Sequence, residues 1–259
     1  MTGDDSDRLR EARGADGVER VRDIVLGSAG PRDYAAADTT PVEDATVAEL
    51  LSLTRAEEPA DRRRATLALA EREGNDRIRD RLAAMASGDA DAEVRQFAVE
   101  ALAKLDADPG VALDRIEADD DQWVRAEATV ALDRLDRAGH EEVFETLVDD
   151  SDAPVRRNAL ISLTRIRGEG TRDRLIEALD DPDDRVREWA VKLLGTHDDD
   201  PTIESALASV VNDPDEEDIV RETAARSLGA TGQDVESLVE GGGGTEMAGD
   251  HVLNGMPDR

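Results

Sequence analysis

Few side chains in this sequence have the type and spacing that chemistry at an active site requires. The three histidines, His140, His197 and His251, stand in different sequence surroundings, and only His140 is followed by a glutamate, Glu141. Metals such as iron need convergent histidine and carboxylate ligands, so these positions predict no metal site. The chain also lacks cysteine, a Gly-x-Ser-x-Gly motif and a glycine-rich phosphate loop. We therefore expect no catalytic residues, no cofactor and no metal.

Runs of carboxylates are the other chemically suggestive feature, because hard cations such as Ca²⁺ and Mg²⁺ take oxygen ligands. None of the runs has the Asp-x-Asp-x-Asp-Gly spacing of a calcium-binding loop. We therefore interpret them as solvated turns rather than as cation sites. The runs occupy residues 119–121, 149–152, 180–184 and 213–217.

The charge balance excludes several classes of partner. The 259 residues include 63 acidic and 32 basic side chains, a formal net charge of −31, which opposes general binding to the phosphates of nucleic acids. No apolar run reaches 18 residues, so no segment is expected to span a membrane. The first ten residues are polar and acidic, with no apolar signal-peptide core. These features predict a soluble, cytoplasmic protein.

The same charge indicates a salty solvent. A net charge of −31 opposes compaction in dilute buffer, but molar salt reduces the Debye length to about 3 Å and removes most of that repulsion. Aspartate outnumbers glutamate, and Lys104 and Lys192 are the only lysines. This composition resembles the proteins of salt-in halophilic archaea. The alternative is an ordinary acidic protein from a GC-rich genome.

A repeat runs through most of the chain and is marked by six arginines, about 31 residues apart. Alanine stands three residues after each arginine, leucine stands seven residues after it, and an acidic residue stands four residues before it. In five of the six, valine immediately precedes the arginine. The marking arginines are Arg62, Arg95, Arg125, Arg156, Arg187 and Arg221.

The offsets −1, +3 and +7 lie on one face of an α-helix, so each block ends in an amphipathic helix. The acid at −4 is expected at or near the helix N-cap. A further helix precedes each of these, and Thr40-Pro41-Val42-Glu43 is interpreted as a capping box opening the first of them. The expected first helices are Val47–Ala56, Ile78–Ala86, Val111–Ala118, Glu141–Val148, Arg172–Leu179 and Ile203–Val211.

Two helices per block, repeated about six times, predict an all-α fold, an α-solenoid. We expect it to span residues 41–231. Residues 1–40 are predicted to be an N-terminal extension with a short capping helix at Val18–Leu26. Residues 232–259 are predicted to be a glycine-rich tail with a half-helix at Val235–Val239. The tail is either a partner-binding segment or, as we favour, untethered.

The segment Asp91–Leu102 has the pattern Asp-x-x-Val-Arg-x-x-Ala-x-x-Ala-Leu. It resembles the short HEAT repeat of the phycobilisome-lyase type, and the resemblance covers about residues 41–231. In such solenoids, acids and arginines of adjacent repeats form a structural ladder. The resemblance implies that role for Asp91, Arg95, Asp121, Arg125, Asp152, Arg156, Asp183 and Arg187.

Proteins with similar repeats include bilin lyase subunits, di-iron deoxyhypusine hydroxylases, and scaffolds, one class of which links taxis signalling to motility. The hydroxylases carry His-Glu pairs just after the arginine position, and none of the six equivalent positions here holds such a pair. The resemblance therefore favours a non-catalytic protein-binding scaffold, with signalling or taxis as a setting, over a lyase-like or hydroxylase-like enzyme. The six positions begin at Arg63, Gln96, Ala126, Arg157, Glu188 and Glu222.

The second helices of such solenoids line the concave side. Their outward positions here carry both lysines and, among other residues, Arg134, Ile161, Arg165 and Arg226, with glutamates such as Glu127 among them. Arginine and tryptophan are common interface anchors. We therefore predict a site for another, acidic, protein at Arg64, Phe97, Arg157, Trp189 and Lys192. The alternative, favoured for any single residue, is that Phe97 and Trp189 are partly buried and the bases neutralise nearby carboxylates.

Overall fold

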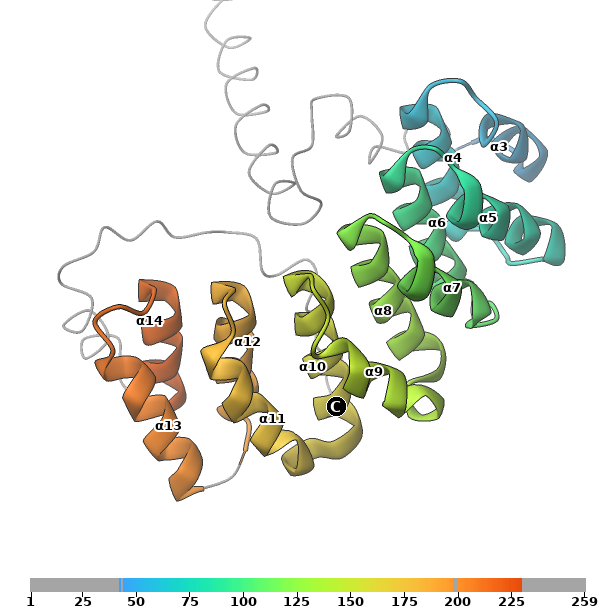
Figure 1. Ribbon diagram of the computed structural model, residues 1–259. Helices are drawn as coiled ribbons and strands as arrows, with labels where there is room; N and C mark the ends of the chain where they lie inside the picture. The colour runs from blue at the N-terminus through green and yellow to red at the C-terminus, as the bar shows by residue number, and fades with distance from the viewer. Residues whose placement is uncertain (1–41, 43, 198–199, 230–259) are drawn as a thin grey trace, which may run out of the picture. The chain divides into compact units, whose positions relative to one another are not determined.

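The computed structural model of the chain describes residues 42, 44–197 and 200–229 (Figure 1). These residues form α-helices and short 3₁₀ turns, with no β-strand among them. The predicted extension 1–40 and tail 232–259 lie outside the described residues, as do the short helices expected at Val18–Leu26 and Val235–Val239. None of the helices described is long and apolar enough to cross a membrane.

The chain divides into two compact units, and the division falls between Ala128 and Thr129, within helix α8 (Gln122–Asp136). In the first unit, the first helices of the repeats are α3 (Val47–Leu53), α5 (Asp76–Gly88) and α7 (Gly110–Ala118). The second helices are α4 (Pro59–Ala70), α6 (Ala92–Lys104) and the start of α8. Helix α4 packs against α3 and α6, and α5 packs against α6 and α7. The first and second helices thus form two layers (Figure 1).

The second unit has the same organisation. Its first helices are α9 (Glu141–Leu147), α11 (Arg172–Glu177) and α13 (Pro201–Asn212), and a 3₁₀ turn, Ala178–Asp180, follows α11. Its second helices are α10 (Ala153–Arg167), α12 (Asp184–Leu194) and α14 (Asp218–Ser227), following the end of α8.

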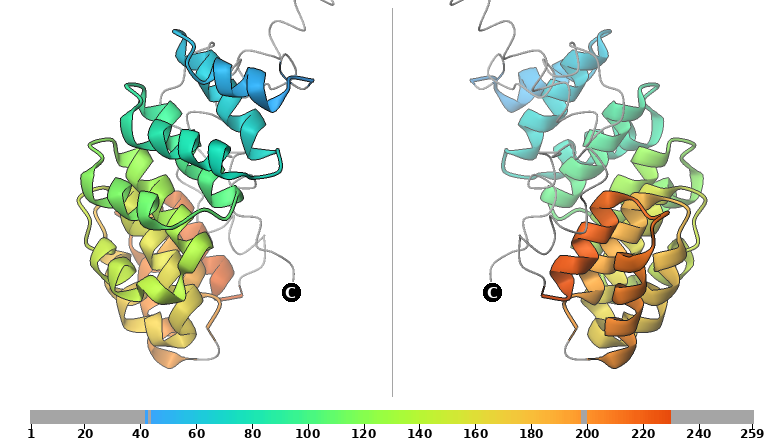
Figure 2. Two further views of the ribbon diagram at one scale, coloured as in Figure 1. Left: turned by 90° about the vertical axis from the view of Figure 1, so that its right-hand side faces the viewer. Right: turned by 90° about the vertical axis from the view of Figure 1, so that its left-hand side faces the viewer.

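Within this unit, α12 packs between α10 and α14, while α9, α11 and α13 cover α10, α12 and α14 in turn. Figure 2 shows these helices from two further sides. The fold is therefore the predicted all-helical α-solenoid.

The repeat positions form the core, as the helical spacing predicts. In α6, Val94, Ala98 and Leu102 are all buried, and the matching positions of the other repeats follow them, with two exceptions, Asp61 and Leu228. Small residues at +3 allow neighbouring helices to approach to about 8–10 Å. Gly195 has a similar role, because a Cβ atom there would lie 2.9 Å from Cβ of Ser227 at the end of α14.

The carboxylates at −4 occupy N-cap positions, as expected. Asp91, Asp121 and Asp183 each accept hydrogen bonds from backbone N–H groups two or three residues later. Thr40, Pro41 and Glu43 of the predicted capping box lie outside the described residues, and the expectation that they open the first helix is wrong, because α3 begins at Val47. Its capping box is formed by Thr46 and Glu49, a second Thr-x-x-Glu pattern that lies six residues further along.

Candidate protein-binding surface

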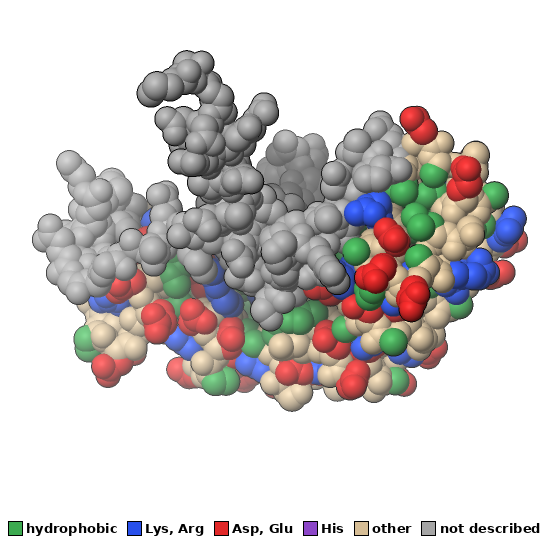
Figure 3. Space-filling view, turned by 90° about the horizontal axis from the view of Figure 1, so that it is seen from above, with side chains coloured by type: hydrophobic (Ala, Val, Ile, Leu, Met, Phe, Trp, Pro, Cys, Tyr) green, Lys and Arg blue, Asp and Glu red, His purple; other side chains and the backbone are tan. Residues whose placement is uncertain are grey.

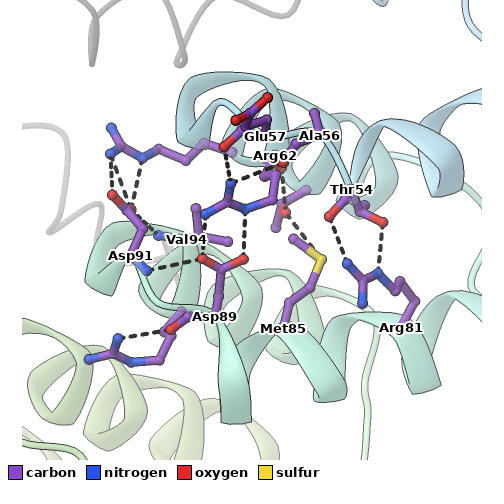
Figure 4. A network of polar contacts seen from close by, with 12 residues as sticks. Thr54, Ala56, Glu57, Arg62, Arg81, Met85, Asp89, Asp91 and Val94 are labelled. Carbon is purple, nitrogen blue, oxygen red and sulfur yellow. Dashed lines mark hydrogen bonds and ion pairs between the residues drawn. The ribbon is translucent and has the colours of Figure 1, made fainter.

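Within each of the two units, arginine–carboxylate contacts form a ladder between successive repeats, and Figure 4 shows one of its rungs. Nε and Nη2 of Arg62 donate to the two oxygens of Asp89 at 2.8 and 2.7 Å. Nη1 of Arg62 donates to the carbonyl oxygens of Ala56 and Glu57. Asp89 also accepts from the backbone N–H of Asp91. One guanidinium group thus binds its own turn and the turn of the following repeat.

The same geometry recurs. Arg95 pairs with Asp119 at 2.8 Å through two hydrogen bonds, Arg156 pairs with Asp181, and Arg187 pairs with Glu216. Each of these arginines also donates through Nη1 to the carbonyl of the residue six positions before it, as Arg125 does to Asp119. A lysine has no planar fork of donors and cannot make both contacts.

These contacts correct the predicted ladder. Of the predicted ladder arginines, Arg95, Arg156 and Arg187 form rungs, but the partner carboxylate of Arg95 is Asp119 and that of Arg156 is Asp181, two residues before the predicted Asp121 and Asp183. The carboxylates at −4 are used elsewhere, since they lie at the N-caps of their own helices. Asp91 in addition pairs with Arg63 at 3.0 Å.

Electrostatics favour the ionised form of these rungs. Burial by itself raises the pKa of Asp119, but the hydrogen bonds from Arg95 and from the backbone of Asp121 outweigh it, so this pKa lies below its ordinary value. Burial likewise raises the pKa of Asp89, but the hydrogen bonds from Arg62 and from the backbone of Asp91 outweigh it, so this pKa is also lowered. The pKa of Arg95 is raised by its hydrogen bond to Asp119. Figure 3 shows acidic and basic side chains interspersed on the described part of the face viewed from above.

The two aromatic residues predicted to bind a partner are core residues. Phe97 on α6 is 8% exposed and Trp189 on α12 is 9% exposed. Both stand two positions after the repeat arginine, where the side chain is enclosed by packing among neighbouring helices. Their burial agrees with the alternative interpretation, in which Phe97 and Trp189 are packed between helices.

The predicted basic residues lie among carboxylates. Arg64 of α4 pairs with Asp61 at 2.9 Å. Lys192 of α12 pairs with the buried Glu188 at 2.9 Å and lies 4.9 Å from the centre of the Trp189 ring. Arg157 of α10 donates from Nε to Asn158. Arg157, Trp189 and Lys192 belong to the second unit, whereas Arg64 and Phe97 belong to the first.

The first unit holds one strongly perturbed carboxyl group. Burial, together with the charge of Glu100, raises the pKa of Glu127 on α8 to about 8, against opposing effects of Gln96 and Lys104. Lys104 pairs with Glu100 at 3.0 Å. The sequence placed Glu127 among the outward positions, but gave no sign that its ionisation would be suppressed.

The second unit presents a different surface on α8, α10, α12 and α14. Val130 is 44% exposed, an unusual exposure for a large apolar side chain. Val130 stands five residues after the repeat arginine of α8. The equivalent residues are the partly buried Ile161 on α10, Lys192 on α12 and the exposed Arg226 on α14. Two exposed arginines follow one turn later on α8 and α10. We call this set the second-unit face; it comprises Val130, Arg134, Ile161, Arg165, Lys192 and Arg226.

Asp133 fixes two of these helices against each other. Its buried carboxylate accepts from Arg165 of α10 at 2.8 Å and from Arg137 at 2.7 Å. The sequence predicted outward positions for Arg134, Ile161, Arg165 and Arg226 but missed Val130. Only the observed exposure identifies that valine.

Metal-ligand groupings are absent from the described part of the chain: no cluster of three or more His, Cys, Asp or Glu residues there could hold an ion. His140 lies at the start of α9, where Nδ1 is 2.9 Å from the carbonyl oxygen of Asp136. Nδ1 of His197 lies 3.1 Å from the carbonyl oxygen of Leu193. His251 falls outside the described residues.

Solved structures with a similar fold are known. YibA of Escherichia coli has 18% sequence identity and a TM-score of 0.54, and the alignment covers 93% of this chain and 90% of YibA. The complex of CpcE and CpcF of phycocyanin lyase from Nostoc sp. has 18% identity and a TM-score of 0.42, covering 84% of this chain and 91% of that one.

An engineered protein has 20% identity and a TM-score of 0.40, covering 74% of this chain and 97% of its own. At these identities the likeness concerns the fold alone. A comparison with curated proteins found no match.

The family comparison rests on the sequence itself. The model for HEAT repeats matches residues 111–195 and 172–241. Together these matches run from residue 111 to residue 241, just over half of the chain. The six helix pairs of the described residues and their arginine ladder agree with that match. The chain belongs to the HEAT-repeat family.

Proposed function

We propose that this protein is a non-catalytic scaffold that binds another protein of acidic surface through the second-unit face. The observation that carries the proposal is the repeating register of that face. Successive helices present Val130, Ile161, Lys192 and Arg226 at one position, with Arg134 and Arg165 beside them. All six residues of the face are apolar or basic on a chain of net charge −31, and three of the bases also pair with carboxylates of the same unit, Asp133, Glu188 and Glu222.

The strip has the composition that protein docking requires. Exposed apolar side chains contribute burial on binding, and arginine is enriched among the residues that dominate binding energy. Clustered basic side chains favour a carboxylate-rich partner and disfavour a basic one. Arg157 and Lys192, predicted from the sequence, lie on helices of this strip and belong to the proposal. The buried Trp189 lies beside Lys192, whose Nζ is 4.9 Å from the centre of its ring.

The cellular setting of the proposal follows from composition. We place the protein in the cytoplasm of a halophilic archaeon, where molar salt screens the repulsion between an acidic scaffold and an acidic partner beyond about 3 Å. Only groups in contact then attract, so a compact basic strip is sufficient for recognition. A role in signalling or taxis is the finer form of this proposal.

Affinity capture from the source cells in molar KCl tests the proposal. Val130→Glu and Arg134→Glu reverse the chemistry of the strip at two exposed positions. Ile219→Glu and Arg77→Glu are matched controls, because these residues are also exposed but lie outside the strip. We expect the strip variants to lose a partner, identified by mass spectrometry, that both controls retain. Equal capture by all four variants would contradict the proposed site.

A further inference from the structure

Two features of the last described helix pair differ from the four rungs described above and from the +7 leucines of the first five repeats. The repeat leucine at +7 is at most 4% exposed in the first five repeats, but Leu228 is 41% exposed. Arg221 is the sixth repeat arginine, and its Nη2 pairs with Asp218 of its own helix. The buried Nε of Arg221 has no hydrogen-bond partner among the described residues.

The earlier repeats show which groups contact the residues equivalent to Arg221 and Leu228. Nε of Arg62, Arg95, Arg156 and Arg187 binds a carboxylate in the turn of the following helix pair. Helix α13, the first helix of the last pair, lies against α11 and α14, and Leu194, the +7 leucine of the preceding helix, is fully buried. The open apolar surface at Leu228 and the unsatisfied nitrogen of Arg221 therefore fit one occupant, a further first helix and its turn.

The segment after α14 has the required sequence. Gly229, with φ +82, ends α14 in the left-handed conformation that turns the chain away from the helix axis. The match to HEAT repeats continues to residue 241, twelve positions past Gly229. Within it, Val235, Leu238 and Val239 recur at the i, i+3, i+4 spacing of an apolar helix face.

The acids of the segment also have the right spacing. Ladder carboxylates lie 24 to 29 residues after their arginine: 27 for Asp89, 24 for Asp119, 25 for Asp181 and 29 for Glu216. Counting from Arg221, that window covers residues 245–250. Its two acidic residues are Glu246 and Asp250.

We propose that residues 230–250 dock on α13 and α14 as a seventh first helix and its turn. Val235, Leu238 and Val239 cover Leu228, and Glu246, with Asp250 beside it, supplies the carboxylate for Nε of Arg221. This docking closes the apolar core of the second unit, which would otherwise be open to a second copy of the chain. It is independent of the proposed partner-binding face.

Disulfide trapping in the full-length chain tests the apolar contact. Because the chain has no native cysteine, any disulfide must form between introduced cysteines. We expect Leu228→Cys with Leu238→Cys to form an intramolecular disulfide readily under mild oxidation, because Cβ atoms that can be bridged must lie about 3.5–4.5 Å apart. The matched control, Leu228→Cys with Leu253→Cys, should cross-link far less. Equal cross-linking of both pairs, or mainly intermolecular disulfides, would overturn the proposal.

Hydrogen exchange tests the rung. Glu246→Gln with Asp250→Asn should increase exchange of the α14 amides by about tenfold, and adding Arg221→Gln should increase it little further. Asp234→Asn with Glu240→Gln removes the same charge outside the spacing window and should leave α14 protected. Equal exchange in the two charge-matched pairs would overturn the assignment of the rung, even if the disulfide forms.

Discussion

At the scale of single residues, the carboxyl group of Glu127 makes the stability of the first unit sensitive to pH. Its pKa is raised to about 8, whereas an unfolded glutamate titrates near 4.3. Between these values the folded chain holds a proton that the unfolded chain releases, so stability falls as the pH rises through this window. Below about pH 4 both states are protonated and the effect is absent.

Glu127→Gln should remove this sensitivity, because glutamine resembles the protonated acid in shape and keeps a group that can bond Gln96. We expect the variant to equal the wild type near pH 5 and to exceed it by about 1–2 kcal/mol at pH 8.5, a figure kept small because the side chain is partly exposed. Urea unfolding across this range measures the difference. The control Glu117→Gln, exposed on α7, should track the wild type, and identical pH profiles for all three proteins would contradict the assignment.

Single residues are also where prediction from sequence was weakest. The helical period places position +2 away from the partner first helix, which made Phe97 and Trp189 look exposed. Their burial comes from neighbouring helices, α4 beside α6 and α10 and α14 beside α12. The spacing of one helix carries no information on how closely the next second helix approaches. The exposure of Val130 depends on the same packing, which is why the sequence did not single it out.

At the scale of helices, three rungs of the ladder use the carboxylate six residues before the next repeat arginine, and the fourth uses Glu216, five residues before Arg221. None of these rungs uses the carboxylate at −4. Asp119→Asn should destabilise the protein by about 2–4 kcal/mol, because it leaves the half-buried guanidinium of Arg95 without its charge partner. Asp121→Asn removes the same charge two residues away, but asparagine caps helices as well as aspartate. It should cost only a few tenths of a kcal/mol. Thermal or urea unfolding compares the two, and equal losses would restore Asp121 as the ladder residue.

The helices themselves were predictable because each is specified by its own sequence. The start of α9 agrees with the prediction, and the end of α7 at Ala118 does so as well. The carboxylate that pairs with Arg95 was not predictable, because the choice between Asp119 and Asp121 depends on a contact with another helix. Both are acids in one turn, and only the structure separates the N-cap from the rung. The capping box was misplaced for a local reason, since two Thr-x-x-Glu patterns occur within ten residues.

At the scale of the whole molecule, the charges divide into two groups that salt affects differently. The ladder pairs are largely buried, with Asp119 1% and Arg95 13% exposed, so dissolved ions screen them little. Exposed carboxylates such as Asp120 contribute to the net charge of −31 and repel one another through solvent. Added salt should therefore weaken the repulsion much more than it weakens the ladder.

The melting midpoint should accordingly rise with KCl. Reducing repulsion by a few kcal/mol in a protein of this size corresponds to a rise of about 5–10 °C between dilute buffer and molar KCl. Differential scanning calorimetry at increasing KCl measures it, and equimolar sucrose separates charge screening from general exclusion of solutes. NaCl should act like KCl if screening is the cause. A midpoint that stays level or falls with salt would mean that the acidic composition reflects a GC-rich genome and that the ladder alone offsets the charge.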